Sequence, residues 1–271
     1  MEMAGGIIGL TEWLQTPAGR YVLEWEQWHL DGAVADLFGF HALQLGLPEL
    51  DALRANRMPH RWVATDGSAV AHSAAEDALP RCAVALHCEF DALPFDGQSL
   101  DLVVLPHGLE QAHDPHQTLR EVERVLVPEG RVVIVGFNPT SLWGLRQRTG
   151  HLRQRLRLGK TPSLFLPSSG EFLGQRRLRD WLRLLSFEVE TGRYGCYRPP
   201  LLSQKWLSRM AWMDRAGERW WPVFGAVYYM VAVKRVRGMR LVGLLPAQRK
   251  APKTAPAVAV NHNHVVGKEM P

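Results

Sequence analysis

The sequence predicts an α/β fold built on a mostly parallel sheet. Residues 100–105 form a nearly continuous apolar run, which is typical of a strand buried on both faces. Residues 131–136 form a second such run, and between the two Asp114-Pro115 opens a segment with helical periodicity. Strand, helix and strand with short joints are typical of a βαβ unit. The 271 residues are 46% hydrophobic, which is enough for one large domain with a full core.

Five further segments are expected to complete the sheet. They are short apolar or alternating runs, bounded in several cases by Gly or Asp, at residues 40–46, 61–65, 83–88, 187–191 and 227–234. Helices are expected at residues 17–30 and 177–185. The first of these has Thr16 as its N-cap and Pro17 at its first helical position.

Two segments interrupt this alternation and are expected to be insertions. Residues 138–174 are rich in Arg, Gly, Pro and Ser, and residues 194–222 carry four tryptophans, Trp206, Trp212, Trp220 and Trp221. From residue 243 onward the chain is poor in aromatic residues and contains several prolines in a basic context. We therefore expect one domain over residues 1–242 and a flexible, disordered basic tail over residues 243–271.

Charge is divided unevenly along the chain. Residues 1–136 contain 8 Lys and Arg against 20 Asp and Glu, whereas residues 137–271 contain 24 against 7. The densest basic segment holds Arg146, Arg148, Arg153, Arg155, Arg157, Lys160, Arg176, Arg177, Arg179 and Arg183. Such a basic second half is typical of proteins that bind nucleic acid or an anionic surface. The alternative is that the two halves neutralise each other across the folded surface.

The cysteines and the apolar runs indicate in which cellular compartment the protein is expected. Cys82, Cys88 and Cys196 form no CxxC pair and no zinc spacing, and an odd, scattered set fits a reducing environment. The first residues lack the basic region of a secretory signal. The longest apolar stretch, residues 220–233, is interrupted by Pro222 and Gly225 and is expected to be a buried strand. We expect a cytoplasmic protein with no transmembrane segment and no metal site.

A longer motif covers the centre of the chain. Residues 91–104 read Asp-Ala-Leu-Pro-Phe-Asp-Gly-Gln-Ser-Leu-Asp-Leu-Val-Val, and residues 119–131 read Leu-Arg-Glu-Val-Glu-Arg-Val-Leu-Val-Pro-Glu-Gly-Arg. In this order the two segments resemble the central signature of S-adenosylmethionine (SAM)-dependent methyltransferases of the type-11 group. The resemblance implies a three-layer, Rossmann-like class I methyltransferase sheet, SAM as the cofactor, and methyl transfer to an acceptor that the sequence does not name.

The expected cofactor site lies at the carboxyl ends of the strands, where ligands bind in open α/β sheets. The resemblance implies that Asp91, with Ala92 and Leu93, lies near the adenine; the alternative is that Asp91 begins a surface turn. Asp66, after the second strand, is the candidate acceptor for ribose hydroxyls, although Asp-Gly-Ser is also ordinary turn chemistry. Gly46, after the first strand, would let the backbone approach the cofactor.

The loop that contains Gly46 departs from the family pattern. Where the family has several glycines, Gly46 is followed by Leu47 and Pro48. We expect these side chains to crowd the methionine end of SAM, and Pro48 offers no N–H donor. The degenerate loop makes weak or absent SAM binding the alternative. In that case the protein would be a non-catalytic, methyltransferase-like protein that binds nucleic acid or an anionic surface.

His107 is the candidate catalytic residue. It follows the fourth strand, near the methyl acceptor in the family, where an imidazole could position the acceptor or take its proton. Methyl transfer is a direct displacement, so alignment is expected to contribute more than acid–base chemistry. The alternative is a structural His that caps or packs the strand end. His107, Glu110 and His113 form no convincing metal set.

Overall fold

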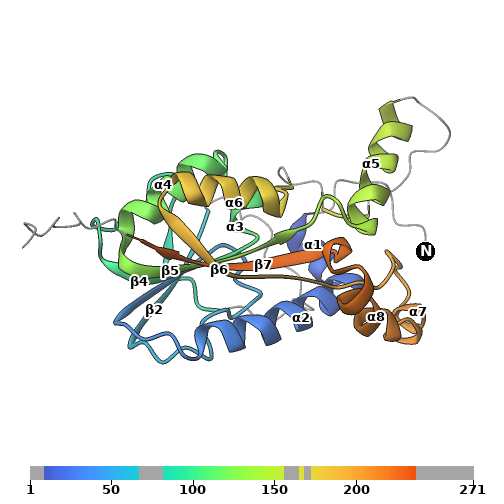
Figure 1. Ribbon diagram of the computed structural model, residues 1–271, viewed down its shortest axis with the longest axis horizontal. Helices are drawn as coiled ribbons and strands as arrows, with labels where there is room; N and C mark the ends of the chain where they lie inside the picture. The colour runs from blue at the N-terminus through green and yellow to red at the C-terminus, as the bar shows by residue number, and fades with distance from the viewer. Residues whose placement is uncertain (1–8, 67–81, 156–164, 168–171, 236–271) are drawn as a thin grey trace, which may run out of the picture. The chain divides into compact units, whose positions relative to one another are not determined.

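A seven-stranded sheet forms the centre of the molecule (Figure 1). The structure is a computed structural model, and it describes residues 9–66, 82–155, 165–167 and 172–235. The strand order is β3-β2-β1-β4-β5-β7-β6, with β7 antiparallel to both of its neighbours and the other pairs parallel. The strands are β1 (His41–Leu45), β2 (His60–Thr65), β3 (Leu86–His87), β4 (Leu100–Pro106), β5 (Leu126–Phe137), β6 (Phe187–Gly195) and β7 (Val227–Lys234).

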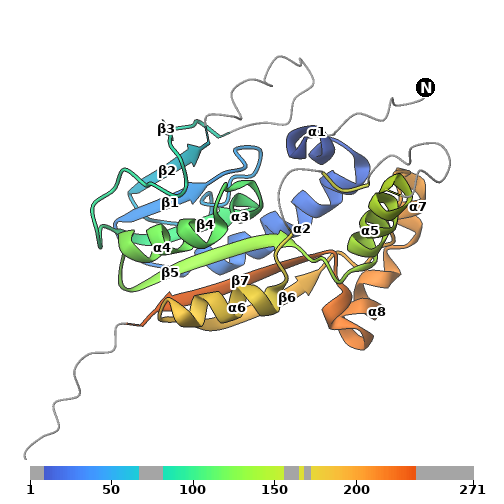
Figure 2. The same ribbon diagram turned by 90° about the horizontal axis from the view of Figure 1, so that it is seen from above.

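Helices cover both faces of this sheet (Figures 1 and 2). The long helix α2 (Pro17–Val34) lies on one face, and α4 (Pro115–Val125) and α6 (Gln175–Leu184) lie on the other. Along β4, Leu102 and Val104 join the apolar core under α2. The alternate residues, Val103 and Leu105, join the core under α4 and α6. Because successive strand residues point to opposite faces and both faces are covered, the central residues 102–105 of β4 are all apolar. The predicted three-layer, mostly parallel fold is confirmed.

Two helix starts follow the expected capping chemistry. Thr16 caps α2, and its Oγ1 accepts a hydrogen bond of 3.1 Å from the N–H of Gly19. Asp114 caps α4, and its Oδ1 accepts from the N–H groups of His116 and Gln117. In both helices the first residue is proline, whose missing N–H is not needed there.

The third and fifth strands differ from the expectation. The third is only Leu86–His87, at the sheet edge, because residues 83–85 are exposed and have no core to cover. The fifth begins at Leu126, which was expected to end the preceding helix, and runs through the predicted turn at residues 128–130. Leu100 pairs with Leu126 and Leu102 with Arg131, so the extra residues form an irregularity inside the strand.

The two segments that are expected to be insertions are partly helical and lie at one end of the sheet (Figures 1 and 2). The first contains α5 (Leu142–Arg155); the second contains α7 (Gln204–Arg209), α8 (Trp212–Trp220) and the 3-10 turn η2 (Pro222–Phe224). This is the end where β5 finishes, so it is the carboxyl end of the parallel strands. The indole N–H of Trp143 in α5 donates to the carbonyl of Arg198, joining the insertions.

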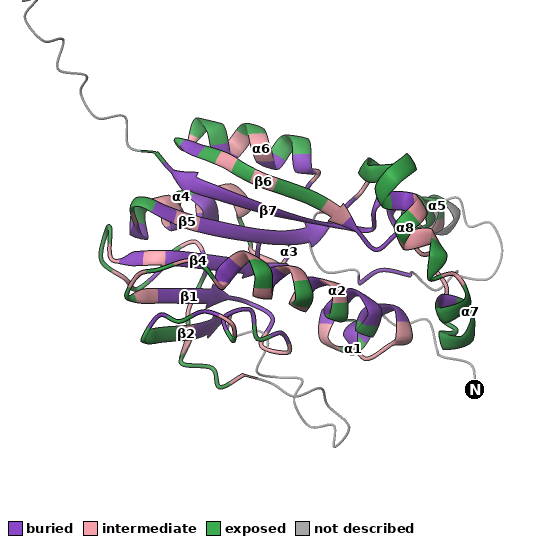
Figure 3. Cartoon of the chain, turned by 60° about the horizontal axis from the view of Figure 1, so that its bottom comes forward, coloured by how far each residue is buried: buried purple, intermediate pink, exposed green. Residues whose placement is uncertain are grey.

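Two short helices complete the described chain, α1 (Leu10–Leu14) and α3 (Gly108–Gln111). Figure 3 shows that the central strands are buried, and all eight residues of β7 are buried, as expected for residues 227–234. Within the described ranges, no helix is both long and apolar enough to cross a membrane. The tail expected at residues 243–271 lies outside the described residues and stays a prediction.

The start of α2 depends on a close backbone crossing at Gly19. A Cβ there would lie 2.4 Å from the Cα of Leu14, whereas a Cβ at Gly32 in the same helix would meet nothing within 4 Å. We expect Gly19→Ala to lower the free energy of unfolding by about 1–3 kcal/mol through overpacking. Gly32→Ala, the matched control, should raise it by about 0.5–1 kcal/mol. Urea denaturation measures both, and equal effects would contradict this account.

Candidate functional site

Four adjacent parallel strands bring the predicted site residues to one edge of the sheet. In the order β3-β2-β1-β4, Asp91 follows β3, Asp66 follows β2, Gly46 follows β1 and His107 follows β4. The carboxyl ends of parallel strands lie at the same edge, so these residues belong to one region of the molecule. Gly46 has a φ of 87°, a conformation that favours glycine.

Asp66 and Asp91 place two half-buried carboxylates along this edge. Asp66 lies near Cys88: burial raises the pKa of that thiol, and the carboxylate of Asp66 raises it further. The side chains of Thr65 and His87 are hydrogen-bonded at 2.9 Å, which fastens β2 to β3 just before these acids. The edge therefore offers hydrogen-bond acceptors that are partly accessible to solvent.

The segment that carries Asp91 is held against α4 by the second part of the sequence motif. Arg124 donates from Nη2 to the carbonyl of Leu93 and from Nη1 to that of Phe95, both at 2.9 Å. Glu121 accepts from the N–H of Leu93 at 3.2 Å, and its hydrogen bond with Arg124 holds its pKa below the usual value. Leu93 is buried and Ala92 is exposed. The two halves of the motif thus form one structural unit.

The loop after β1 is organised around the buried side chain of Gln44. Its Nε2 donates to the carbonyls of Gly46, Leu47 and Leu50 at 2.7–3.2 Å, and its Oε1 accepts from the N–H of Ala52 at 3.0 Å. Buried backbone groups need such partners, since each unsatisfied one costs about 1–3 kcal/mol. One side chain therefore fixes the path of the whole loop.

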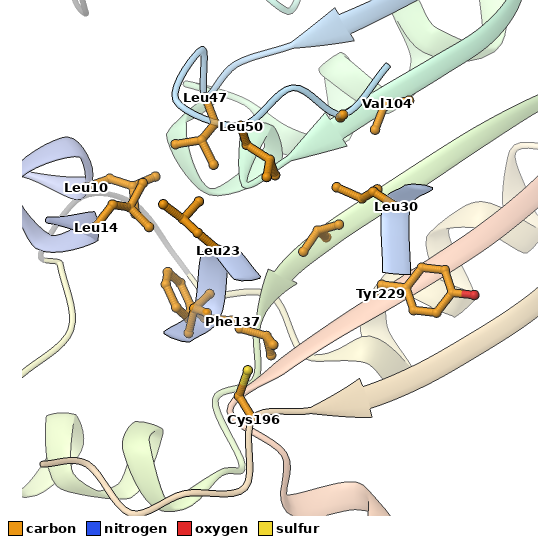
Figure 4. Packing of buried hydrophobic residues seen from close by; sticks show 14 of the residues in the cluster. Leu10, Leu14, Leu23, Leu30, Leu47, Leu50, Val104, Phe137, Cys196 and Tyr229 are labelled. Carbon is orange, nitrogen blue, oxygen red and sulfur yellow. The ribbon is translucent and has the colours of Figure 1, made fainter. Parts of the chain in front are cut away.

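Leu47 and Leu50 attach this loop to the first two helices. Both side chains are 2% exposed and belong to an apolar cluster with Leu10 and Leu14 of α1 and Leu23 of α2 (Figure 4). Leu47 has a φ of 40°, in the left-handed region. The side chain expected to crowd the cofactor is thus part of the core that joins the loop to the helices.

His107 lies at the centre of a buried cluster of charged side chains. It is the N-cap of α3 with a φ of 54°, and its N–H donates to the carbonyl of Val135. Its Nδ1 is 2.8 Å from Glu110 Oε2, and its Nε2 is 2.8 Å from Glu26 Oε1 of α2. His107 and Glu26 are fully buried, and Glu110 nearly so.

The cluster holds His107 in its charged form. Burial lowers the pKa of His107, but the carboxylates of Glu26 and Glu110 outweigh it and raise the pKa to about 10. Both ring nitrogens then donate, so no lone pair remains to accept a proton. Glu110 also accepts from the N–H of Phe137 at 2.5 Å. In contrast, Glu26 Oε2 is buried with no hydrogen-bond partner.

The sequence expectations did not include Glu26 or Gln44. Val22, Glu26 and Leu30 are four residues apart on one face of α2, and all three are buried. A carboxylate on an otherwise apolar helical face is a signal that sequence reasoning could have used. Gln44, a polar residue inside an apolar strand, is a second such signal. Within the described residues, no group of three or more His, Cys, Asp or Glu could hold a metal ion.

Comparison with known families relates part of this arrangement to proteins that are already described. Residues 47–134 match the sequence model of a family described as a methyltransferase domain. This segment, which is less than half of the chain, is similar to that family. It contains three of the four strands at the candidate edge in full, together with α3 and α4.

Individual relatives share part of the sequence or the fold. The chain is 31% identical over 179 residues to the uncharacterised protein YafS of Escherichia coli K12, and the alignment covers 65% of each chain. It is 44% identical over 52 residues to the ubiquinone/menaquinone biosynthesis C-methyltransferase UbiE of Hahella chejuensis, covering 19% of this chain and 21% of UbiE. A solved SAM-dependent methyltransferase from Archaeoglobus fulgidus shares the fold, with a TM-score of 0.51, 16% identity, and coverage of 78% of this chain and 94% of that chain.

The residues around the carboxyl ends of β1, β2, β3 and β4 are chemically compatible with SAM. The adenosine part of SAM carries hydroxyl and amino donors, and Asp66 and Asp91 offer acceptors at the edge. The methionine part carries a sulfonium, an ammonium and a carboxylate group, so its net charge is positive. The carboxyl groups of Glu26 and Glu110 share the one ring of His107, and Glu26 Oε2 is the atom without a partner. The loop after β1 contributes one glycine, Gly46.

The charged state of His107 can be observed directly. Both ring nitrogens of His107 should be protonated at pH 8 in ¹⁵N-detected imidazole spectra, where an ordinary histidine is neutral. The contribution of charged His107 to the free energy of unfolding should be fully present below pH 6.5, the pKa of the histidine in the unfolded chain. It should be lost as the pH rises through about 10, the pKa in the folded protein. Glu26→Gln should lower the His107 pKa, because one carboxylate is removed. A neutral His107 ring at pH 8 in the wild-type protein would contradict the cluster.

Proposed function

We propose that this protein is a SAM-dependent methyltransferase that binds its cofactor at the carboxyl edge of β1–β4. The observation that supports this most strongly is the methyltransferase-domain match over residues 47–134, which spans the loop after β1, Asp66 and Asp91. In this proposal Asp91 accepts from the adenine amino group, while Ala92 and Leu93 supply backbone and apolar contact. Asp66 accepts from the ribose hydroxyls.

The remaining roles follow from charge and burial. When bound, SAM supplies an electrophilic methyl group on a sulfonium, and direct displacement requires mainly alignment. We assign Glu26 to the cationic methionine end, because its Oε2 is buried and unpartnered. His107 acts as a positioning residue, since its 2.8 Å contact holds the Glu26 carboxylate in place. A base role for His107 would first require this cluster to open.

We propose only the class of reaction, methyl transfer from SAM, and we name no methyl acceptor. UbiE, which shares one short segment with this chain, is named as a C-methyltransferase of ubiquinone and menaquinone biosynthesis. The description of YafS, which shares much more of the chain, names no reaction.

We also propose the cytoplasm as the cellular compartment, because Cys82, Cys88 and Cys196 are all free thiols, as a reducing environment favours.

Binding of S-adenosylhomocysteine, measured by isothermal titration calorimetry, tests the cofactor site without an acceptor. We expect saturable binding to the wild-type protein and at least tenfold weaker binding to Asp91→Asn. The reason is that a hydrogen bond to a charged acceptor contributes about 1.5–3 kcal/mol. Asp96→Asn, five residues away on the exposed part of the same segment, is the matched control and should bind like the wild type.

Two outcomes would count against the proposal. Absence of heat at millimolar ligand, with the fold confirmed by circular dichroism, would leave the non-catalytic alternative. Equal weakening by Asp91→Asn and Asp96→Asn would show that the effect is not specific to the proposed adenine contact.

A further inference from the structure

The second insertion presents an unusual number of exposed apolar side chains. They come from the segment before α7, from α7 and α8, and from η2. Their exposed fractions lie between 44% and 75%. We call these residues the insertion surface: Leu202, Trp206, Trp212, Trp220, Trp221, Val223 and Phe224. Large exposed apolar patches on soluble domains usually mark an interaction site.

This insertion is fixed to the body by few side chains. Helix α7 buries only Leu207, α8 buries only Gly217, and η2 buries none of its residues. Asp214 anchors α8, because its Oδ1 accepts from the Tyr21 hydroxyl at 2.5 Å and its Oδ2 from Arg198 Nε at 2.9 Å. The insertion is therefore held in a defined place while most of its side chains face outward.

The outward face of α8 combines aromatic and basic groups. Trp212, Arg215 and Arg219 follow one another at i, i+3 and i+7, so they share one face of the helix, and all three are exposed. Arg209 of α7 lies over the ring of Trp206, 5.9 Å from its centroid. Exposed basic side chains thus lie among the tryptophans of both helices.

The charge of the insertion is positive on its exposed side. Lys205 and the three arginines of α7 and α8 are exposed. Of the two acids, Asp214 is already paired with Arg198, which leaves Glu218 as the exposed acid of the two helices. An anionic partner therefore complements this surface.

Helix α5 of the first insertion adds a second exposed apolar face beside it. Leu142, Leu145 and Leu152 are 49–57% exposed and follow at i, i+3 and i+10, whereas Trp143 on another face is buried. The Arg146 guanidinium donates to the carbonyl of Pro200, which ties α5 to the segment leading into α7. Figures 1 and 2 both place α5, α7 and α8 at the same end of the sheet.

We propose that the insertion surface docks on a bilayer that contains anionic lipid. Tryptophan is enriched at membrane–water interfaces, and helices with Trp and Leu beside Arg and Lys are typical of interfacial binding. A nucleic acid can stack on exposed aromatic rings beside basic groups, but it offers no partner for the exposed aliphatic side chains of Leu142, Leu145 and Leu152. A symmetric contact between two copies of this surface would bring the basic groups of both copies together. The bilayer satisfies the apolar and the basic groups at once.

The position of the surface links docking to the rest of the molecule. It lies at the carboxyl end of the parallel strands, the same end as Asp66, Asp91 and His107. Docking there would hold the candidate site close to the lipid headgroups. The docking itself uses no residue of the cofactor site, so it can be tested whether or not SAM binds.

Co-sedimentation with large unilamellar vesicles tests the proposal on the full chain. We expect saturable binding to vesicles of 30% phosphatidylglycerol in phosphatidylcholine, much weaker binding to pure phosphatidylcholine, and loss of binding at high salt. Arg215→Glu with Arg219→Glu should weaken binding by at least about 30-fold, since each basic residue near the surface contributes about fivefold. Trp212→Ser with Trp220→Ser should weaken it by about tenfold or more.

Matched controls come from exposed residues elsewhere. Phe38→Ser with Phe40→Ser removes two aromatic rings that are 78% and 69% exposed, just before β1 at the opposite end of the sheet. Arg183→Glu reverses an exposed charge on α6. Both controls should bind vesicles like the wild type. Quenching of tryptophan fluorescence by brominated lipids should occur in the wild type and decrease in the Trp212, Trp220 variant.

Several results would overturn the proposal. They are absence of binding to anionic vesicles by folded protein, equal binding to neutral vesicles, or unchanged binding by both double variants. Loss of RNA binding in the same variants, without vesicle binding by the wild type, would assign the surface to nucleic acid. A dimer in sedimentation velocity that dissociates in the Trp212, Trp220 variant, without vesicle binding, would assign it to a second copy.

Discussion

The contact between His107 and its two carboxylates is the interaction on which the site depends. It joins Glu26 of α2 to the turn after β4. Glu110 extends the cluster to the end of β5, because its carboxylate also accepts a hydrogen bond from the N–H of Phe137. Three segments far apart in the chain are thereby fixed around one imidazolium. Removing one partner from such a buried cluster leaves an uncompensated charge, which usually costs several kcal/mol. The same cluster leaves one oxygen, Glu26 Oε2, without a partner.

The loop after β1 shows how a glycine-poor sequence can keep the turn of the fold. Gln44 satisfies the backbone from inside the strand, and Leu47 and Leu50 fasten the loop to α1 and α2 through apolar contact. Gly46 provides the left-handed conformation, and the neighbouring backbone is close at Gly108, where a Cβ would lie 2.7 Å from the carbonyl oxygen of Leu45. The departure from the family pattern is thus matched by packing that the first two helices supply.

Helix α2 connects the candidate site to the insertion surface. Tyr21 holds Asp214 of α8, and Glu26, one and a half turns later, holds His107. Between them lies the buried thiol of Cys196, whose pKa is raised by burial and by the nearby carboxylate of Glu26. Helix α2 therefore contributes one residue to the proposed cofactor site and one to the anchor of the insertion surface.

The sequence by itself determined the sheet and its order of elements, because buried strands and capped helices leave local patterns. Residues 227–234 and the caps Thr16 and Asp114 are examples. It also placed Gly46, Asp66, Asp91 and His107 at strand ends, since that follows from the alternation of strand and helix. Only the tertiary structure decided what surrounds them: Glu26 meets His107 across 81 residues, and Leu47 enters a core formed by α1 and α2. Such contacts are set by how helices pack on the sheet, and no local periodicity records them.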